Sequence, residues 1–267
     1  MKLSIALFVA LTGATLAIAQ PHGRLVWSDE FNGSANTAPD SAKWTYDLGN
    51  NNGWGNRELE NYTKDPENAH LDGKGNLVIR AQPAKDSPNS YTSARIKTQG
   101  LFAASPNGRV EARIKVPAGA GIWPAFWMLG NTFNGRNWPA CGEIDIMESL
   151  GREPSINHGS LHGPGYSGSK PMTSIYTLPG ARKFSDDYHI FAIDWKPTEI
   201  TFYVDDTAYE TVRNTDIPAG TKWVFDQPFF LILNVAVGGN FGGPVGPATV
   251  FPQEMLVDYV RVFRQSR

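Results

Sequence analysis

The run Phe229–Val237 constrains the fold most, because it is apolar on both faces apart from one amide. Side chains alternate between the faces of a strand, so the run predicts a central strand covered on both sides. Glycine and proline, 27 and 19 of 267 residues, favour turns over long helices. Many short strand-like runs separated by turns predict an all-β fold, a sandwich of two antiparallel sheets in one domain. The clearest of these other runs are 77–81, 109–116, 200–204 and 256–263.

Two of these runs carry further detail. Charged and apolar residues alternate without a break from Arg109 to Val116, which predicts a half-buried strand with one solvated face. The run 200–204 is followed by Asp205-Asp206 and then Tyr209, which predicts a hairpin.

Three carboxylates fall within six residues of the segment Glu143-Ile-Asp-Ile-Met-Glu148. Branched Ile144 and Ile146 suit a strand, on which Glu143 and Asp145 point to the same face. Strict alternation would place the methionine, not Glu148, on that face. One extra residue, a β-bulge, returns Glu148 to it, so the segment predicts a bulged strand.

Three acids on one face repel one another and lose hydration, which raises a carboxyl pKa. Glycoside hydrolysis needs this, because one carboxylate attacks or stabilises while one carboxylic acid protonates the leaving oxygen. A calcium site is the first alternative, but the run is too apolar between its acids. A solvated acidic edge is the second, and it would not carry three apolar side chains on its other face. The pattern therefore favours catalytic Glu143, Asp145 and Glu148.

The acidic segment resembles the bulged active-site signature of glycoside hydrolase family 16. The segments Ile122–Met128 (IWPAFWM) and Gly53–Thr63 (GWGNRELENYT) resemble the laminarinase branch, the endo-1,3-β-glucanases. The resemblance runs from about Leu25 to Phe263. It implies a β-jelly-roll with a concave substrate cleft and a β-glucan polysaccharide as substrate. It also implies a retaining mechanism with Glu143 as nucleophile and Glu148 as acid and base.

Sugar rings stack on aromatic faces while their hydroxyl groups need polar partners. Asn234 is the most telling polar candidate, because a lone amide in so apolar a strand needs a partner. Arg95 alternates with apolar neighbours and is also compatible with a surface ion pair. The substrate-binding residues that the resemblance implies are Asn56, Arg95, Trp123, Trp127, Trp138, His162 and Asn234.

The family resemblance also implies a structural Ca²⁺ on the convex face, and no cofactor for catalysis. The matching positions are Glu30 and Gly75 through their backbone carbonyls and Asp258 through its side chain. Such hard oxygen ligands suit calcium.

Residues Met1–Ala19 have the pattern of a secretory signal peptide, with Lys2, an apolar stretch and a small-residue cleavage site. The remainder, 20–267, is then the catalytic domain of a secreted protein, extracellular or periplasmic. We expect a monomer with no membrane segment after cleavage. The net charge of −2 gives no basic footprint for nucleic acid.

Related substrates stay open at this point. They are mixed-linkage β-1,3-1,4-glucan and the algal galactans agarose and carrageenan. The bulge disfavours the mixed-linkage specialists, and Gly53–Thr63 favours laminarin over the galactans. A rival from another class is a non-catalytic β-glucan-binding domain on the same fold, which would not need the paired acids.

Overall fold

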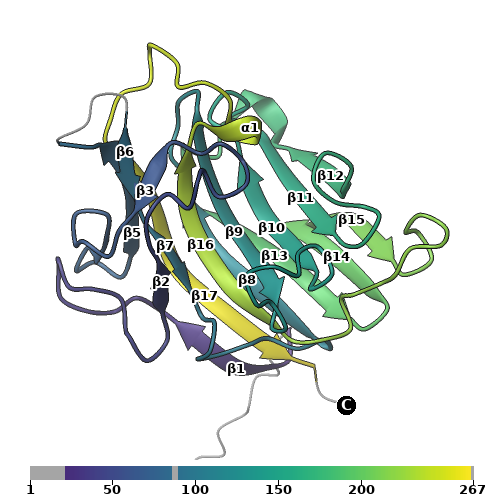
Figure 1. Cartoon of the computed structure of the whole chain (residues 1–267). Coiled ribbons are helices and arrows are strands. Elements are labelled where there is room, and N and C mark those ends of the chain that lie inside the picture. Colours follow the sequence, from purple (N-terminus) through teal and green to yellow (C-terminus); the bar gives the residue numbers. More distant parts are fainter. Residues whose placement is uncertain (1–21, 86–89, 266–267) are drawn as a thin grey trace, which may run out of the picture.

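The protein is a two-sheet β-sandwich, shown in Figure 1 as a computed structural model that describes residues 22–85 and 90–265. This confirms the all-β jelly-roll class. The expected signal peptide Met1–Ala19 lies outside the described residues. In the described part of the chain, helix is confined to one 3₁₀ turn, η1 (Pro179–Ala181), and one α-helical turn, α1 (Gly239–Gly242). Within the described ranges, the helices are too short to cross a membrane.

The larger sheet has ten strands, namely β1 (Arg24–Asp29), β3 (Glu60–Tyr62), β4 (Ala69–Leu71), β5 (Leu77–Pro83), β6 (Tyr91–Ser93), β8 (Gly108–Lys115), β13 (His189–Lys196), β14 (Glu199–Val204), β15 (Thr207–Arg213) and β17 (Gln253–Arg264). Their spatial order is β15-β14-β13-β8-β17-β5-β6-β3, with β1 beside β17 and β4 beside β5. The pairing is antiparallel except between β3 and β6, which run parallel. The predicted hairpin is confirmed, since Val204 at the end of β14 pairs with Thr207 at the start of β15.

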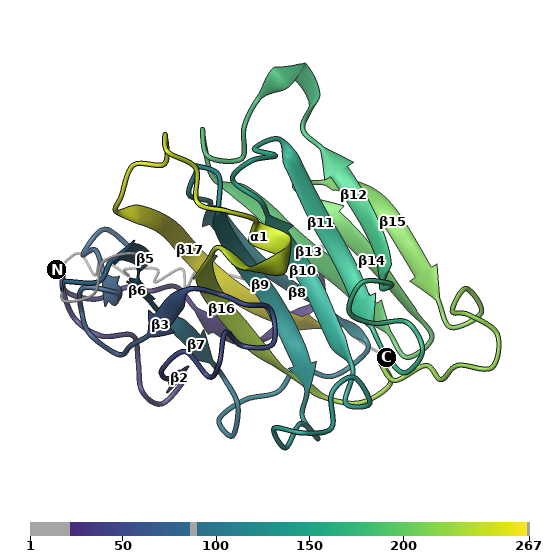
Figure 2. The same ribbon diagram turned by 45° about the horizontal axis from the view of Figure 1, so that its top comes forward.

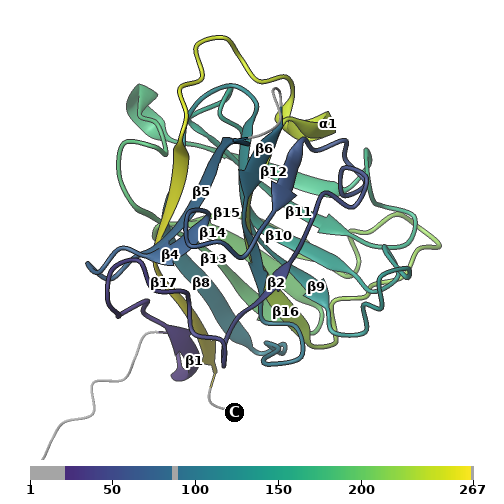
Figure 3. The same ribbon diagram turned by 60° about the vertical axis from the view of Figure 1, so that its left-hand side comes forward.

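The smaller sheet has seven strands, namely β2 (Thr45–Asp47), β7 (Arg95–Lys97), β9 (Ile122–Gly130), β10 (Glu143–Ser149), β11 (Ile156–His162), β12 (Met172–Thr177) and β16 (Phe229–Val237). Their order is β12-β11-β10-β9-β16-β7-β2. Figure 2 shows α1 lying over the ends of β9 and β16, which it contacts. The two ends of the described chain lie side by side, because Arg24 in β1 pairs with Arg264 in β17 (Figure 3).

The central strand β16 is buried along its whole length, as its sequence predicts. Leu231, Leu233 and Val235 face the other sheet and belong to the main core. The alternate residues Phe230 and Ile232 face outward, where they pack with Leu129 and Cys141. These outward-facing residues therefore form an apolar floor on the outer side of the seven-stranded sheet.

The prediction of a solvated face for β8 holds for Arg113 and Lys115, which are partly exposed, and is wrong for the first half of the strand. Arg109 and Glu111 are both buried, and Arg109 Nε donates to Glu111 Oε2 at 2.6 Å. Arg109 also lies 3.2 Å from Asp194 of β13, with its guanidinium 5.0 Å from the ring centroid of Tyr203. β8 lies between β13 and β17. Long side chains of these neighbouring strands therefore cover Arg109 and Glu111, which the alternation of charged and apolar residues alone would place in water.

This buried pair gives a stability prediction. We expect Arg109→Leu to lower the free energy of unfolding by about 3–5 kcal/mol, because it leaves Glu111 buried without its partner. Urea denaturation followed by tryptophan fluorescence measures the change. Lys196→Met is the matched control, since it removes an exposed lysine that pairs with Glu199 on the surface. Equal shifts in the two variants would contradict the prediction.

Candidate active site

The bulge predicted in β10 is present, and it determines where the acids point. Against β11 the register shifts between Asp145 and Glu148, and against β9 it shifts between Asp145 and Met147. Ile144 and Met147 are fully buried in the core between the sheets. Glu143, Asp145 and Glu148 are thereby placed together on the opposite, outer face.

The strand register arranges this face in rows across the sheet. One row runs Ile232, Trp127, Asp145 and Ser160. The next runs Arg95, Asn234, Ala125, Glu148 and His158. Side chains in a row of paired residues point the same way, so the rows bring predicted binding residues and predicted catalytic acids onto one surface.

Each of the two glutamates predicted to be catalytic accepts a hydrogen bond from an indole. Trp138 Nε1 donates to Glu143 Oε2 at 2.7 Å, and Trp123 Nε1 donates to Glu148 Oε1 at 3.0 Å. Trp138 is 41% exposed, so it can offer a ring face to a sugar. Trp123 is only 8% exposed, because it packs with Leu150.

His162 lies beside the first two acids. Its Nε2 is 3.1 Å from Asp145 Oδ2 and 3.8 Å from Glu143 Oε1, and its ring tilts against Trp138 with centroids 6.0 Å apart. The backbone N–H of Gly168 donates to His162 Nδ1 at 3.2 Å. A neutral ring that accepts at Nδ1 carries its proton on Nε2, so His162 presents N–H to the carboxyl groups.

Burial makes the three carboxyl groups weak acids. Desolvation, and then the charge of Asp145, raise the pKa of Glu143 to about 8. Desolvation raises the pKa of Asp145 to about 8 as well. For Glu148, desolvation and then the charges of Asp145 and Glu143 raise the pKa well above its ordinary value. The cluster therefore holds more protons near neutral pH than three solvated carboxyl groups would, and its members titrate as a coupled set.

A metal ion is the other use of such a cluster. Ligand atoms of Glu143, Asp145 and His162 lie within 4.8 Å of one another. A metal on His162 Nε2 would move the ring proton to Nδ1, directly against the N–H of Gly168. The tautomer therefore favours proton chemistry over metal binding at this place.

Asn234 has the partners that its burial requires, as predicted. Trp127 Nε1 donates to Asn234 Oδ1 at 2.7 Å, and Asn234 Nδ2 donates to the Tyr62 hydroxyl at 3.0 Å. The guanidinium of Arg95 stacks over Trp127 at 4.6 Å and pairs with Asp47 at 3.0 Å. Arg95 is therefore a largely buried stacking residue as well as one half of an ion pair.

Asn56 lies at the edge of this group, where its Nδ2 donates to Glu58 Oε1 at 3.1 Å. Sequence reasoning included Glu58, Glu60 and Tyr62 only as letters of the Gly53–Thr63 motif and gave them no role. A signal was available in their spacing of two, which predicts one strand face carrying two carboxyl groups and a phenol.

The residues expected to bind calcium lie away from the acids. Glu30 uses its carboxylate to hold Arg261, at 2.7 and 3.0 Å, and Asp258 Oδ2 accepts from Arg113 at 2.7 Å. Gly75 lies in a turn with φ of 92°. Asp258 belongs to β17 of the ten-stranded sheet, so these residues are on the opposite side of the sandwich from Glu143.

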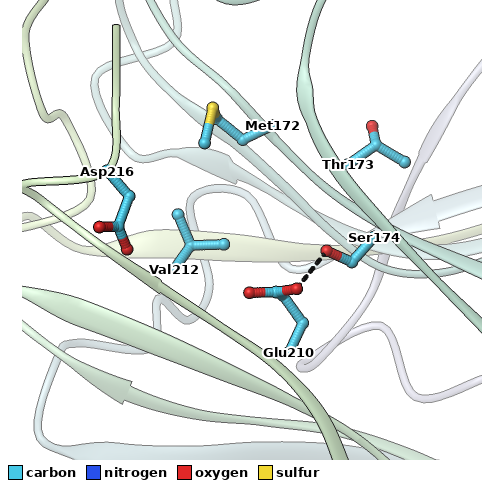
Figure 4. A pocket seen from close by; sticks show the side chains of 6 residues that line it. All are labelled: Met172, Thr173, Ser174, Glu210, Val212 and Asp216. Atoms are coloured by element: carbon cyan, nitrogen blue, oxygen red, sulfur yellow. Dashed lines mark hydrogen bonds between the residues drawn. The ribbon is translucent and has the colours of Figure 1, made fainter.

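A separate hollow of about 220 Å³ opens between the edge strands β12 and β15 (Figure 4). Ser174 Oγ donates there to Glu210 Oε2 at 2.8 Å. Its lining, as far as the chain is described, has no aromatic ring to stack on a sugar. The residues predicted to bind sugar are instead concentrated on the face of β9, β10 and β16.

Comparison with known proteins agrees with this geometry. The family model of glycosyl hydrolases family 16 matches residues 57–260. The chain belongs to this family. It is 44% identical to the "Beta-glucanase" of Rhodothermus marinus, over 98% of this chain and 92% of that protein.

Solved structures of the family superpose closely on this chain. An endo-β-1,3-glucanase from Pyrococcus furiosus is 50% identical with a TM-score of 0.83, covering 90% of this chain and 93% of that one. The laminarinase catalytic domain of Thermotoga maritima is 45% identical with a TM-score of 0.85, covering 91% and 99%.

The hydrogen bond from the Trp138 indole to Glu143 can be tested directly. Trp138→Phe keeps an aromatic ring but removes the donor, and one hydrogen bond to a charged group is worth roughly a ten- to hundredfold loss in kcat/KM. The lost donor favoured the ionised form of Glu143, so its pKa rises and the acidic limb of the pH profile moves to higher pH. Initial rates across pH measure both effects.

Trp223→Phe is the matched control. It removes an indole donor to the carbonyl of Pro197, which is in another part of the chain from the acids. We expect normal activity and an unmoved pH profile. An acidic limb that stays in place in Trp138→Phe would mean that the indole does not act on Glu143.

Proposed function

We propose that this protein is a retaining endo-β-glucanase that hydrolyses β-1,3-glucosidic linkages in laminarin-type glucans. The observation that carries the proposal is the outer face of β10. There Glu143 and Glu148 each accept an indole N–H, and Asp145 lies between them. Two carboxyl groups in different surroundings on one strand supply the nucleophile and the acid that a retaining enzyme needs.

In the first step the Glu143 carboxylate attacks the anomeric carbon. Glu148 gives its proton to the glycosidic oxygen as the carbon–oxygen bond breaks, so the leaving chain departs neutral. Each glutamate accepts an indole N–H and feels the charge of Asp145, so these two influences act on both. Glu148 also feels the charge of Glu143, which raises its pKa further and makes it the better proton donor.

In the second step water replaces Glu143 at the anomeric carbon. The Glu148 carboxylate takes the proton of the attacking water, and the ester bond to Glu143 breaks. Both groups then have their starting protonation. Asp145 and the Nε2–H of His162 remain beside Glu143 throughout and hold the charge pattern of the site.

The choice of substrate is supported by the side chains around the acids and by the activities of the relatives. Trp138, Trp127 and Arg95 offer stacking surfaces beside the acids, and Asn56 and Asn234 offer amides. The related structures are those of an endo-β-1,3-glucanase and a laminarinase catalytic domain. A non-catalytic glucan-binding role would not require three desolvated acids, and mixed-linkage glucan is the second candidate within the same chemistry.

We further propose that the protein is exported and acts as a monomer outside the cytoplasm. The composition of Met1–Ala19 supports export. An extracellular or periplasmic place suits an enzyme whose substrate is a polymer.

Azide rescue tests the roles of the two glutamates. Both variants should be nearly inactive, because the residues act as a unit. Glu143→Gly leaves space below the anomeric carbon, so azide with an aryl β-laminarioside should give the α-glycosyl azide. Glu148→Ala retains the nucleophile, so azide should enter from above the covalent intermediate and give the β-glycosyl azide. Proton NMR of the anomeric centre distinguishes the products.

Asp145→Asn is the matched variant for this experiment. Azide cannot replace a group that only holds charge, so we expect no rescue. Interchanged stereochemistry would exchange the roles of Glu143 and Glu148. A wild-type product that first appears as the α-anomer would eliminate the retaining mechanism.

A structural calcium ion on the convex face is a separate proposal. Glu30 and Gly75 would bind it through backbone carbonyls and Asp258 through its carboxylate. One observation supports the proposal: an ideal Cβ at Gly75 would lie 3.7 Å from Asn32 Oδ1, so the chain just after Glu30 approaches this turn. One carboxylate oxygen of Asp258 remains outside its bond to Arg113. Hard oxygen ligands from separate segments suit calcium, which would join them.

Chelation tests this site. Excess EGTA should lower the melting temperature while activity at low temperature stays the same, because the ion stabilises only the folded chain. Differential scanning calorimetry measures the shift. Asp258→Asn should melt at the lower temperature and respond less to EGTA, and identical melting curves for wild type with and without EGTA would rule the ion out.

A further inference from the structure

A second pair of buried carboxyl groups lies beside the cleft, and the proposed mechanism does not use it. Glu58, Glu60 and Tyr62 share one face of the segment that contains β3, and they are 7%, 0% and 2% exposed. The backbone of Glu58 pairs with that of Gly238 in an isolated β-bridge, and the backbone N–H of Val237 donates to Glu60 Oε2 at 2.7 Å. The pair therefore lies against the end of β16, beyond the cleft floor.

A directed series of hydrogen bonds leads from the cleft to Glu58. Trp127 donates to Asn234, Asn234 donates to Tyr62, and the Tyr62 hydroxyl donates to Glu58 Oε2 at 3.2 Å. Asn56 donates to the other oxygen of Glu58. Each member donates toward Glu58, so the series needs a carboxylate that accepts at both oxygens.

Glu60 is where a proton must be. Among the described residues its Oε1 is buried without a hydrogen bond of good geometry, and the side chains that approach the Glu60 carboxyl are those of Glu58 and Tyr62. Two buried carboxylates in contact repel each other, and neither has a cation of its own there. Desolvation, and then the charge of Glu58, raise the pKa of Glu60 to about 9. A proton on Oε1 directed to Glu58 satisfies both groups.

We propose that Glu58 and Glu60 share one proton and act as a positioning pair for the cleft. Glu60 carries the proton, and Glu58 is the final acceptor that fixes Asn56 and, through Tyr62 and Asn234, the ring of Trp127. With its amide nitrogen bound to Glu58, Asn56 has its oxygen left for a sugar hydroxyl. The part of this inference that concerns sugar rests on the proposed glucan substrate.

The pair makes glucan binding sensitive to alkali. When the shared proton is lost, two adjacent charges separate, and the series loses its final acceptor. The other ionisable groups that face the pair are Tyr62 on the same strand and Arg95 of β7, whose charge Asp47 of β2 balances. Glucan affinity then falls above about pH 9, the range in which Glu60 loses its proton.

Glu60→Gln is the decisive variant, because an amide has the shape of the protonated acid at every pH. Its N–H donates to Glu58, and its oxygen accepts from Val237. The affinity for laminari-oligosaccharides is measured by calorimetry in a Glu143→Gln background, which leaves the ligand uncleaved. Between neutral and high pH we expect the reference protein to lose about tenfold more affinity than the Glu60→Gln protein, equivalent to one to two hydrogen bonds, because Asp145 and Glu148 titrate in both proteins and only Glu60 differs.

Glu58→Gln removes the final acceptor instead of fixing the protonated form. Its amide accepts at one end only, so it cannot serve both Asn56 and Tyr62. We expect weak binding at every pH, and in the active enzyme a raised KM with little change in kcat. Affinity that falls in parallel in the reference and Glu60→Gln proteins would overturn the proposal.

Infrared difference spectra test the proton without any glucan. Glu60→Gln should remove one protonated-carboxyl band at neutral pH, whereas the control Glu199→Gln, which changes an exposed carboxylate paired with Lys196, should not. A missing band change overturns the shared proton. An intact band change with no oligosaccharide binding in the reference protein points instead to a wrong substrate class.

Discussion

Three carboxyl groups share one dry face of β10, and the bulge after Asp145 makes this possible. Without it Met147 would point into the cleft and Glu148 into the apolar core, where Met147 is now fully buried. The bulge lets Ile144, Ile146 and Met147 stay in the apolar core while the outer face keeps the three acids. The rest of the site depends on this one extra residue, because it sets the row in which Glu148 pairs.

Among the described residues, indole N–H groups, and not lysine or arginine side chains, contact the predicted catalytic glutamates directly. Trp138 and Trp123 offer indole N–H groups, and His162 offers Nε2–H. The charge of His162 lowers the pKa of both glutamates, and that of Arg95, which pairs with Asp47, lowers the pKa of Glu143 as well. A lysine or arginine directly on Glu148 would hold it ionised and remove the acid. Neutral donors orient the carboxyl groups while burial keeps their pKa values high, which is the combination that acid catalysis near neutral pH needs.

The sequence was sufficient for the sandwich, the central strand β16 and the bulge, because each depends on local alternation of apolar and polar residues. It also identified Asn234, since a buried amide must have partners. It failed for Arg109 and Glu111, whose burial depends on side chains from neighbouring strands. It gave no role to Glu58 and Glu60, because their importance comes from the approach of a distant strand, β16, and such register is not local information.

The two carboxyl clusters are linked by necessity through Asn234. This amide stands in the same row as Glu148, two strands away or roughly 10 Å, on the floor of the cleft. Its oxygen accepts a hydrogen bond from Trp127 Nε1, so its nitrogen needs an acceptor, which is the Tyr62 hydroxyl. The phenol in turn needs an acceptor of its own, and Glu58 supplies it. A carboxylate at that depth beside Glu60 is tolerable only if one of the two keeps a proton. One polar residue in an apolar strand thus requires a protonated acid three hydrogen bonds away.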